Sequence, residues 1–123
     1  MMYAYIDGDD IGLKIENSFM ENDEVRLKYV NELVKETVST INLELESRGF
    51  TLIFGGADGI ICKKEDINIE ELLNYIRELS KKQLTFSIGV GMSLRDAFLA
   101  LRYAKSSGKN IGALYKNEFT LYK

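Results

Sequence analysis

Short apolar runs alternate with amphipathic stretches along the chain, and this pattern predicts a domain that mixes strands and helices. The apolar runs lie at 3–6, 51–54, 59–62 and 84–91, and they are rich in β-branched and aromatic residues. That composition favours strands. The second and third runs flank a turn that contains two glycines, so they are expected to form a β-hairpin.

Three amphipathic stretches, at about 24–48, 69–82 and 93–108, predict helices. In the first of them apolar residues recur at spacings of three and four, which makes one buried stripe. The stripe consists of Leu27, Val30, Val34, Val38, Ile41 and Leu45. Residues with cap or stop character mark the helix ends. They are Asn68 with Glu71, Ser93 with Asp96, Gly49 and Gly108.

The predicted order of elements is β-α-β-β-α-β, followed by a helix and by two short strands at 113–115 and 119–122. The first six elements match the ferredoxin-like or split βαβ arrangement, an antiparallel sheet with helices on one face. We therefore expect an α+β fold in a single domain that covers residues 1–123. In this arrangement the first strand lies beside the central hairpin, which places Asp7 near Asp58.

The aromatic residues of the predicted strands are expected in the core: Tyr3, Tyr5, Phe54 and Phe86. Cys62 is likewise expected to be buried in a strand. As the single cysteine it cannot form an internal disulfide, which fits a reducing cytoplasm. No apolar run approaches the roughly 20 residues of a membrane span, and the N-terminus lacks a signal-peptide pattern. We therefore expect a cytoplasmic protein with no membrane partner.

Charge and composition narrow the chemistry further. The chain has 16 basic and 19 acidic residues, and the resulting net charge of −3 argues against a polymeric nucleic acid as partner. Histidine is absent. This absence excludes Ser-His-Asp and Cys-His catalysis, an imidazole general base and histidine-ligated zinc.

Two short acidic segments stand where predicted strands end: Asp7-Gly8-Asp9-Asp10 and Gly55-Gly56-Ala57-Asp58. Carboxylates at neighbouring strand ends can converge on one point, where they need cations between them. Hard oxygen ligands of this kind suit Mg²⁺, which takes substrate phosphates as further ligands. The pattern predicts a metal-dependent phosphoryl-transfer enzyme. Each segment, taken alone, is equally well explained as a polar or glycine-bearing turn.

A calcium-binding EF-hand does not fit the first segment. Asp7, Asp9 and Gly12 occupy the first, third and sixth places of such a loop. However, Ile11 and Ser18 occupy the fifth and twelfth places, and the twelfth requires a bidentate glutamate. The segment is therefore not an EF-hand.

Two lysines follow one another closely near the end of the last predicted helix, at Lys105 and Lys109. Lysines in this position usually favour the helix dipole and remain solvated. In the expected fold, however, this helix end can reach the acidic segments and present two ammonium groups to a triphosphate. A P-loop is excluded, because no Gly-x-x-x-x-Gly-Lys-Ser/Thr pattern is present.

Four stretches in this order carry a resemblance: the strand ending in Asp7, Phe-Gly-Gly-Ala-Asp at 54–58, Phe-Ser-Ile-Gly-Val-Gly at 86–91 and Ala-Lys-Ser-Ser-Gly-Lys-Asn at 104–110. The chain resembles the nucleotide-cyclase palm shared by GGDEF diguanylate cyclases and the polymerase subunit of type III CRISPR systems. The resemblance covers about residues 3 to 112. A palm this short, opening with Asp-Gly-Asp-Asp-Ile-Gly, is most similar to the minimal CRISPR polymerases.

The resemblance implies a site with two Mg²⁺ ions, for which Mn²⁺ is expected to substitute. Asp7 and Asp58 match the carboxylates that hold the metals and support catalysis, with Asp9 as a further metal ligand. Nucleotide binding falls to glycines and charged residues of the same motifs. These are Gly55, Gly56, Lys105, Lys109, Asp10 and Gly12. Two ions about 3.5–4 Å apart would assist an in-line displacement.

Departures from the family pattern bear on the substrate and on activity. Ala57 stands where an aspartate is usual. Ile15 and Phe98 occupy the places from which diguanylate cyclases read guanine with polar side chains. Because a guanine site without polar partners loses discrimination, ATP is the expected substrate, with other nucleoside triphosphates as alternatives.

The expected product is a cyclic di- or oligonucleotide, specifically a cyclic adenylate. The resemblance implies a second messenger in bacterial antiviral defence and a separate effector that senses it. Because two triphosphates must face each other while one palm offers one site, a two-fold homodimer is expected. Two alternatives stay open: a catalytically silent palm that binds a nucleotide as sensor or scaffold, and an interaction domain without a ligand.

Overall fold

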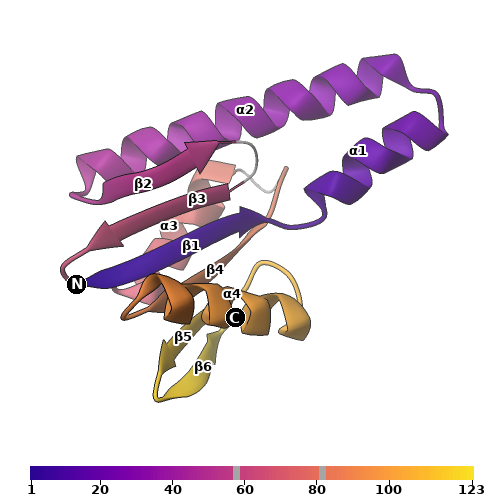
Figure 1. Cartoon of the computed structure of the whole chain (residues 1–123). Helices are drawn as coiled ribbons and strands as arrows, with labels where there is room; N and C mark the ends of the chain where they lie inside the picture. Colours follow the sequence, from indigo (N-terminus) through magenta and orange to yellow (C-terminus); the bar gives the residue numbers. More distant parts are fainter. Residues whose placement is uncertain (57–58, 81–82) are drawn as a thin grey trace.

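The protein is described by a computed structural model that covers residues 1–56, 59–80 and 83–123. In this part of the chain, six strands form one mixed sheet in the order β2-β3-β1-β4-β5-β6 (Figure 1). The strands are β1 (Met2–Gly8), β2 (Thr51–Gly56), β3 (Gly59–Lys64), β4 (Phe86–Gly91), β5 (Gly112–Lys116) and β6 (Glu118–Tyr122). Neighbouring strands are antiparallel except β4 and β5, which are parallel.

The described residues also form four helices, three of which pack against this sheet. The four helices are α1 (Ile11–Met20), α2 (Glu24–Ser47), α3 (Ile69–Ser80) and α4 (Leu94–Ser107). Helices α2 and α3 cover one face, and α4 lies on the other (Figure 1). In the described part of the chain, no helix is both long and apolar enough to cross a membrane.

The alternation along β1 assigns its side chains to the two faces. Ala4 and Ile6 are fully buried in the main core, where the apolar stripes of α2 and α3 also lie. Tyr5 and Asp7 point to the opposite face, since Tyr5 pairs with Gly89, which packs against α4. The catalytic candidates of the first strand therefore lie on the α4 side of the sheet.

The predicted α+β palm-like fold, with its β-α-β-β-α-β core, extra helix and terminal hairpin, is confirmed. The strand order around β1 is that of the ferredoxin-like arrangement. The caps at Asn68 and Ser93 are present, each accepting a hydrogen bond of 3.1 Å from the backbone N–H three residues on. The helix predicted over 69–82 is described as far as Ser80. Residues 81–82 lie outside the described part.

Helix α1, over Ile11–Met20, was not among the helices predicted from the sequence. This helix lacks the usual signals. Its N-cap, Asp10, has a left-handed backbone (φ 56°) and makes no capping hydrogen bond with its side chain. Of its apolar residues only Ile11 is buried, while Leu13, Phe19 and Met20 are exposed, so the helix has no continuous buried stripe.

The prediction that Phe54 belongs to the core was also wrong, since this ring is 57% exposed. Phe54 lies on β2, an edge strand of the sheet. Helix α4 packs on β4, β5 and β1, so it does not cover β2. Phe86 and Cys62 are buried as expected, while Tyr3 and Tyr5 are half-buried. Burial raises the pKa of the Cys62 thiol to about 12, which keeps this cysteine neutral and unreactive.

Helix α4 approaches the sheet closely because β4 has glycines beneath it. A Cβ on Gly89 would overlap the backbone of Ala97 and Leu101, with Leu101 Cα at 2.7 Å. A Cβ on Gly91 would lie 2.6 Å from Asp96 Cβ. This close contact fixes the height at which α4, and with it Lys105, lies above the strands.

Gly89→Ala is expected to destabilise the fold by about 1–3 kcal/mol, because the added methyl group must push α4 away from the sheet. Urea denaturation would measure the change in the free energy of unfolding. Gly12→Ala is the control, since a Cβ at this position meets no atom within 4 Å. Alanine also favours a helix more than glycine does, so this variant should not lose stability. Equal stability of the two variants would contradict the close-packing argument.

Candidate active site

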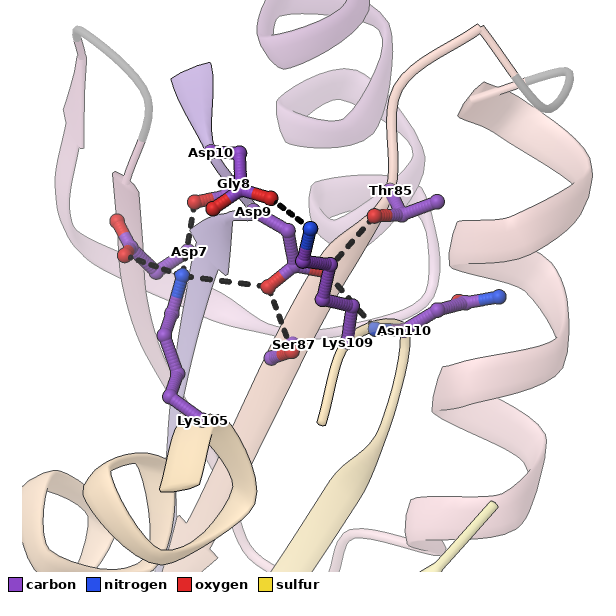
Figure 2. A network of polar contacts seen from close by, with 9 residues as sticks. All are labelled: Asp7, Gly8, Asp9, Asp10, Thr85, Ser87, Lys105, Lys109 and Asn110. Atoms are coloured by element: carbon purple, nitrogen blue, oxygen red, sulfur yellow. Dashed lines mark hydrogen bonds and ion pairs between the residues drawn. The ribbon is translucent and has the colours of Figure 1, made fainter. Parts of the chain in front are cut away.

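Four segments converge at the C-terminal end of β1: residues 7–10, the start of β4, the last turn of α4 and the loop that leads to β5 (Figure 2). The sheet register brings them there. Asp7 pairs with Gly59 of β3 on one side and with Ser87 of β4 on the other. The α4 side of this strand end therefore collects acidic residues from the N-terminus and basic residues from the C-terminal part.

Asp9 is the most buried acidic residue of this cluster, with 5% exposure. Each of its carboxylate oxygens accepts two hydrogen bonds. Oδ1 accepts from Ser87 Oγ (2.8 Å) and from Lys105 Nζ (3.3 Å). Oδ2 accepts from Thr85 Oγ1 (2.8 Å) and from the backbone N–H of Asn110 (2.8 Å). These four donors stabilise the charge of a buried carboxylate.

Lys105 bridges the acidic segment from above. Its ammonium nitrogen lies 2.9 Å from Asp7 Oδ2 and 3.3 Å from Asp9 Oδ1, and it donates to the Gly8 carbonyl oxygen at 2.8 Å (Figure 2). Burial opposes the charge, but the hydrogen bond and the charge of Asp7, together with Asp9, raise the pKa of the ammonium. Lys105 is therefore held as a cation between three oxygen atoms.

Lys109 forms an ion pair with Asp10 at the N-terminus of α1. The hydrogen bond from Lys109 lowers the pKa of the Asp10 carboxyl, and the same bond raises the pKa of the lysine. An open pocket of about 320 Å³ lies beside this pair. Its lining comes from both ends of the chain: Asp9, Asp10, Lys105, Ser106, Ser107, Gly108 and Lys109.

The hairpin between β2 and β3 borders the same end of the sheet. Gly55 and Gly56 end β2, and Gly56 pairs with Gly59. Gly59 is so close to Asp7 that a Cβ there would lie 3.3 Å from Asp7 Oδ1. Asp58, predicted as the second metal-holding carboxylate, and Ala57 lie outside the described residues. Gly59, the residue that follows Asp58 in the sequence, is adjacent to Asp7 in the sheet.

The remaining predicted residues lie around this centre. Gly12 is in the first turn of α1, where a Cβ would meet open space. Ile15, on the same helix, is partly buried against the main core. Phe98 is exposed on α4, and the Arg102 guanidinium lies 5.8 Å from its ring centre. Neither Ile15 nor Phe98 is part of the Asp9 network.

The donor set at the strand end is suited to a hard cation. Within residues 1–56, 59–80 and 83–123, no three acidic, histidine or cysteine side chains form a cluster able to hold a metal. However, Asp7 Oδ2 and the Gly8 carbonyl already share the Lys105 ammonium, at 2.9 and 2.8 Å. A cation therefore lies between these two oxygens, and both are of the type that Mg²⁺ prefers.

Three residues of the network were not predicted from the sequence: Thr85, Ser87 and Asn110. Ser87 was detectable in principle, because it is a hydroxyl residue inside the buried strand β4 and a buried hydroxyl needs a partner. Thr85 and Asn110 stand in connecting segments, where polar residues are ordinary.

The sequence model of one family, described as the minimal CRISPR polymerase domain, matches residues 3–115 of the chain. The match includes all of the predicted motifs. A comparison with curated proteins found no significant match.

Solved structures with a similar fold include two proteins described as diguanylate cyclases and one described as an EAL/GGDEF domain protein. A diguanylate cyclase/phosphodiesterase from Caldicellulosiruptor saccharolyticus has 17% identity and a TM-score of 0.65, over 97% of this chain and 78% of that one. An EAL/GGDEF domain protein from M. capsulatus has 21% identity and a TM-score of 0.64, over 94% and 84%. The active GGEEF domain of a Vibrio cholerae diguanylate cyclase has 18% identity and a TM-score of 0.66, over 94% and 82%. At these identities the likeness shows the fold.

Proposed function

Since this chain belongs to the family described as the minimal CRISPR polymerase domain, we propose that it is a nucleotidyltransferase that converts ATP into a cyclic adenylate. The observation that carries this proposal is the position of Lys105. Its ammonium lies between Asp7 Oδ2 and the Gly8 carbonyl, at the strand end where two carboxylates are expected to hold metal ions. These oxygens already contact one cation, the ammonium, and the adjacent lysine-lined pocket suits an anionic triphosphate.

Asp7 and Asp58 are the residues proposed to hold Mg²⁺, or Mn²⁺ in its place, with the Gly8 carbonyl as a further oxygen. The bound metal pair would supply an activated ribose hydroxyl and neutralise charge on the α-phosphate and the departing pyrophosphate. Asp9 has a different role in this proposal. Because its oxygens already accept from four donors, it orients Lys105 rather than binding the metal predicted for it.

The two lysines act on the triphosphate. Lys105 exchanges its contact with Asp7 for phosphate oxygens when a nucleotide and metal enter, and Lys109 does the same from its pair with Asp10. Gly55, Gly56 and Gly12 allow the nucleotide to approach the backbone closely. Catalysis then depends on positioning and charge neutralisation, with no nucleophilic side chain. This mechanism suits a chain without histidine.

Lys109→Met is expected to raise KM for ATP about 10-fold while changing kcat less, since an exposed lysine contributes a charge-assisted hydrogen bond to ground state and transition state alike. Steady-state kinetics at fixed Mg²⁺ would measure both constants. Lys116→Met, at the end of β5, is the control for losing one positive charge. An unchanged KM in the Lys109 variant would remove this residue from the proposed triphosphate site.

Ring closure requires two nucleotides whose reactive groups face each other. We therefore propose a two-fold homodimer with its two sites opposed. The cyclic adenylate would act as a second messenger in bacterial antiviral defence, read by a separate effector. The cytoplasm is the proposed location, which the buried free thiol of Cys62 supports.

Incubation of the purified protein with each nucleoside triphosphate and Mg²⁺, followed by mass spectrometry, tests the proposal. A cyclic adenylate that is absent with Asp58→Ala is the expected result. The Asp58 variant must melt at the wild-type temperature for the comparison to count. Untouched nucleotides with wild-type protein, under both Mg²⁺ and Mn²⁺, would refute the enzymatic proposal.

A catalytically silent, nucleotide-binding palm is the second candidate, and Ala57 favours it because this position usually carries an acidic residue in the resembling families. This candidate predicts a nucleotide-dependent rise in melting temperature without release of pyrophosphate. A domain without any ligand predicts neither effect. One thermal-shift series with ATP and Mg²⁺, read beside the product assay, separates the three.

A further inference from the structure

We propose that Arg77, on the last turn of α3, is a positioning residue for the site at the end of β1. The inference rests on the proposed function, but Arg77 belongs to none of the motifs that support that function. Its side chain reaches 33 positions along the chain to Asn110, whose backbone N–H in turn binds Asp9. Arg77 thus acts on the acidic cluster through the loop that follows α4.

The first step of this connection is a two-point contact. Arg77 Nε donates to Asn110 Oδ1 at 3.0 Å, and Arg77 Nη2 donates to the Asn110 carbonyl oxygen at 2.7 Å. Both bonds are partly shielded from solvent. A guanidinium can make this pair of bonds because its donors lie in one rigid plane, whereas a lysine would make one bond at a time.

The contact holds an unusual backbone conformation in place. Asn110 has φ 57°, in the left-handed region that is uncommon for residues other than glycine. This conformation directs its N–H at Asp9 Oδ2, 2.8 Å away (Figure 2). The residue before it is Lys109, which is the second lysine that lines the proposed triphosphate pocket. One tethered residue therefore sets the direction of both a buried hydrogen bond and a phosphate-binding side chain.

The second step runs from Asp9 to the reacting centre. Oδ2 of Asp9 accepts hydrogen bonds from the Asn110 N–H and from Thr85 Oγ1. Oδ1 therefore accepts the hydrogen bonds from Ser87 and Lys105. If Oδ2 lost the Asn110 bond, the carboxylate could rotate away from the orientation in which it holds Lys105. A displaced Lys105 would then approach Asp7 and the triphosphate from the wrong direction.

A purely helix-capping role for Arg77 is the plainer explanation, because a cation in the last turn of a helix favours the helix dipole. The two explanations make different predictions. Capping requires only a positive charge near the end of α3, so lysine would replace arginine fully. Positioning requires the two-point contact, so lysine would replace it only in part.

The test uses Arg77→Met and Arg77→Lys, with Arg95→Met as a control from the exposed surface of α4. Hydrogen exchange of the Asn110 amide, measured by NMR, is the readout that does not depend on catalysis. Arg77→Met is expected to accelerate this exchange about 10-fold or more. Without the tether, the Asn110 N–H opens more often from its hydrogen bond to the buried carboxylate of Asp9. The kcat of Arg77→Met is expected to fall about 10–100-fold, as for residues that orient catalytic ligands, while KM for ATP rises by less than in Lys109→Met because Lys109 itself is retained.

Arg77→Lys is expected to lie between wild type and Arg77→Met in both measurements. Asn110 exchange that stays at the wild-type rate in Arg77→Met would overturn the inference. So would full rescue of exchange and kcat by lysine, or a kcat for Arg77→Met equal to that of Arg95→Met. If Arg77→Met does not fold, the lysine variant alone decides: partial loss supports the inference, and wild-type values refute it.

Failure of the proposed function would be visible separately. If wild-type protein makes no product from any nucleotide, the exchange rate of the Asn110 amide still decides whether Arg77 orders this loop. Faster exchange in the variant supports the positioning role, and unchanged exchange refutes it. The control variant should show wild-type exchange in either case.

Discussion

Asp7→Asn is expected to lower nucleotidyl transfer by about 10³-fold or more while leaving the fold intact. The substitution keeps the shape of the side chain but removes the charge that holds the Lys105 ammonium at 2.9 Å and, in the proposed mechanism, a metal ion. The backbone pairing of residue 7 with Gly59 and Ser87 is unaffected, so the strand should persist. Product formation from ATP and Mg²⁺ would be measured by mass spectrometry, and folding by thermal melting.

Asp66→Asn is the matched control, because it makes the same chemical change on an exposed residue. It follows β3, whose end pairs with the start of β1, so it lies at the opposite end of the sheet. Activity of the Asp7 variant close to that of this control would mean that the carboxylate at the strand end takes no part in the reaction.

Lys105→Met is expected to lose about 10²–10³-fold in activity, because the reaction then lacks the charge that we propose faces the triphosphate. The same change leaves Asp7 and the buried Asp9 without the ammonium that both contact. We therefore also expect the free energy of unfolding to fall by about 1–3 kcal/mol, the usual cost of an incompletely paired buried polar group. Steady-state kinetics and urea denaturation would measure the two effects.

Lys28→Met on α2 serves as the control, since its side chain is 78% exposed and its ion pair with Glu24 spans 3.9 Å on the helix surface. That variant should change stability by less than about 0.5 kcal/mol. A Lys105 variant as active and as stable as the control would show that the network seen around Asp9 does not need its lysine.

The elements that bury an apolar stripe or run were predictable from the sequence. Helix α2 follows the three-and-four spacing of its apolar residues, and its observed bounds, Glu24–Ser47, differ little from the predicted range. The β2–β3 hairpin follows its glycine turn, and α4 ends where Gly108 stands. In α2 the periodicity that the sequence displays is the one that the core requires, whereas β2 remains mostly exposed.

Helix α1 could not be predicted in this way, because its apolar residues are mostly not buried. Phe19 and Met20 are 67% and 82% exposed. The helix packs along α2 rather than on the sheet, so it needs only a narrow contact. Its start at Asp10 carries no capping side-chain bond. Helix α1 therefore has neither a continuous buried apolar stripe nor a side-chain cap that marks its first residue.

The acidic and basic residues of the site were recognisable, but their hydrogen-bond partners were not. Asp9 was predicted as a further metal ligand, and its burial as an acceptor of four hydrogen bonds was not predicted. Its burial depends on donors from β4, α4 and the loop before β5, which meet only after the sheet has formed. Spacing along the chain carries no information about such contacts, which arise from the register of distant strands.

The contacts of Asp9 also impose an order on synthesis. They join residue 9 to residues 105 and 110, which are separated from it by 96 and 101 positions. At about 5–20 residues per second, the ribosome needs about 5–20 s to pass from one side of the contact to the other. Throughout that time the carboxylate of Asp9 stays hydrated and the acidic segment has no lysine to face. A nascent or truncated chain that stops before Lys105 therefore carries the acidic motif without the ammonium that Asp7 and Asp9 contact in the folded protein.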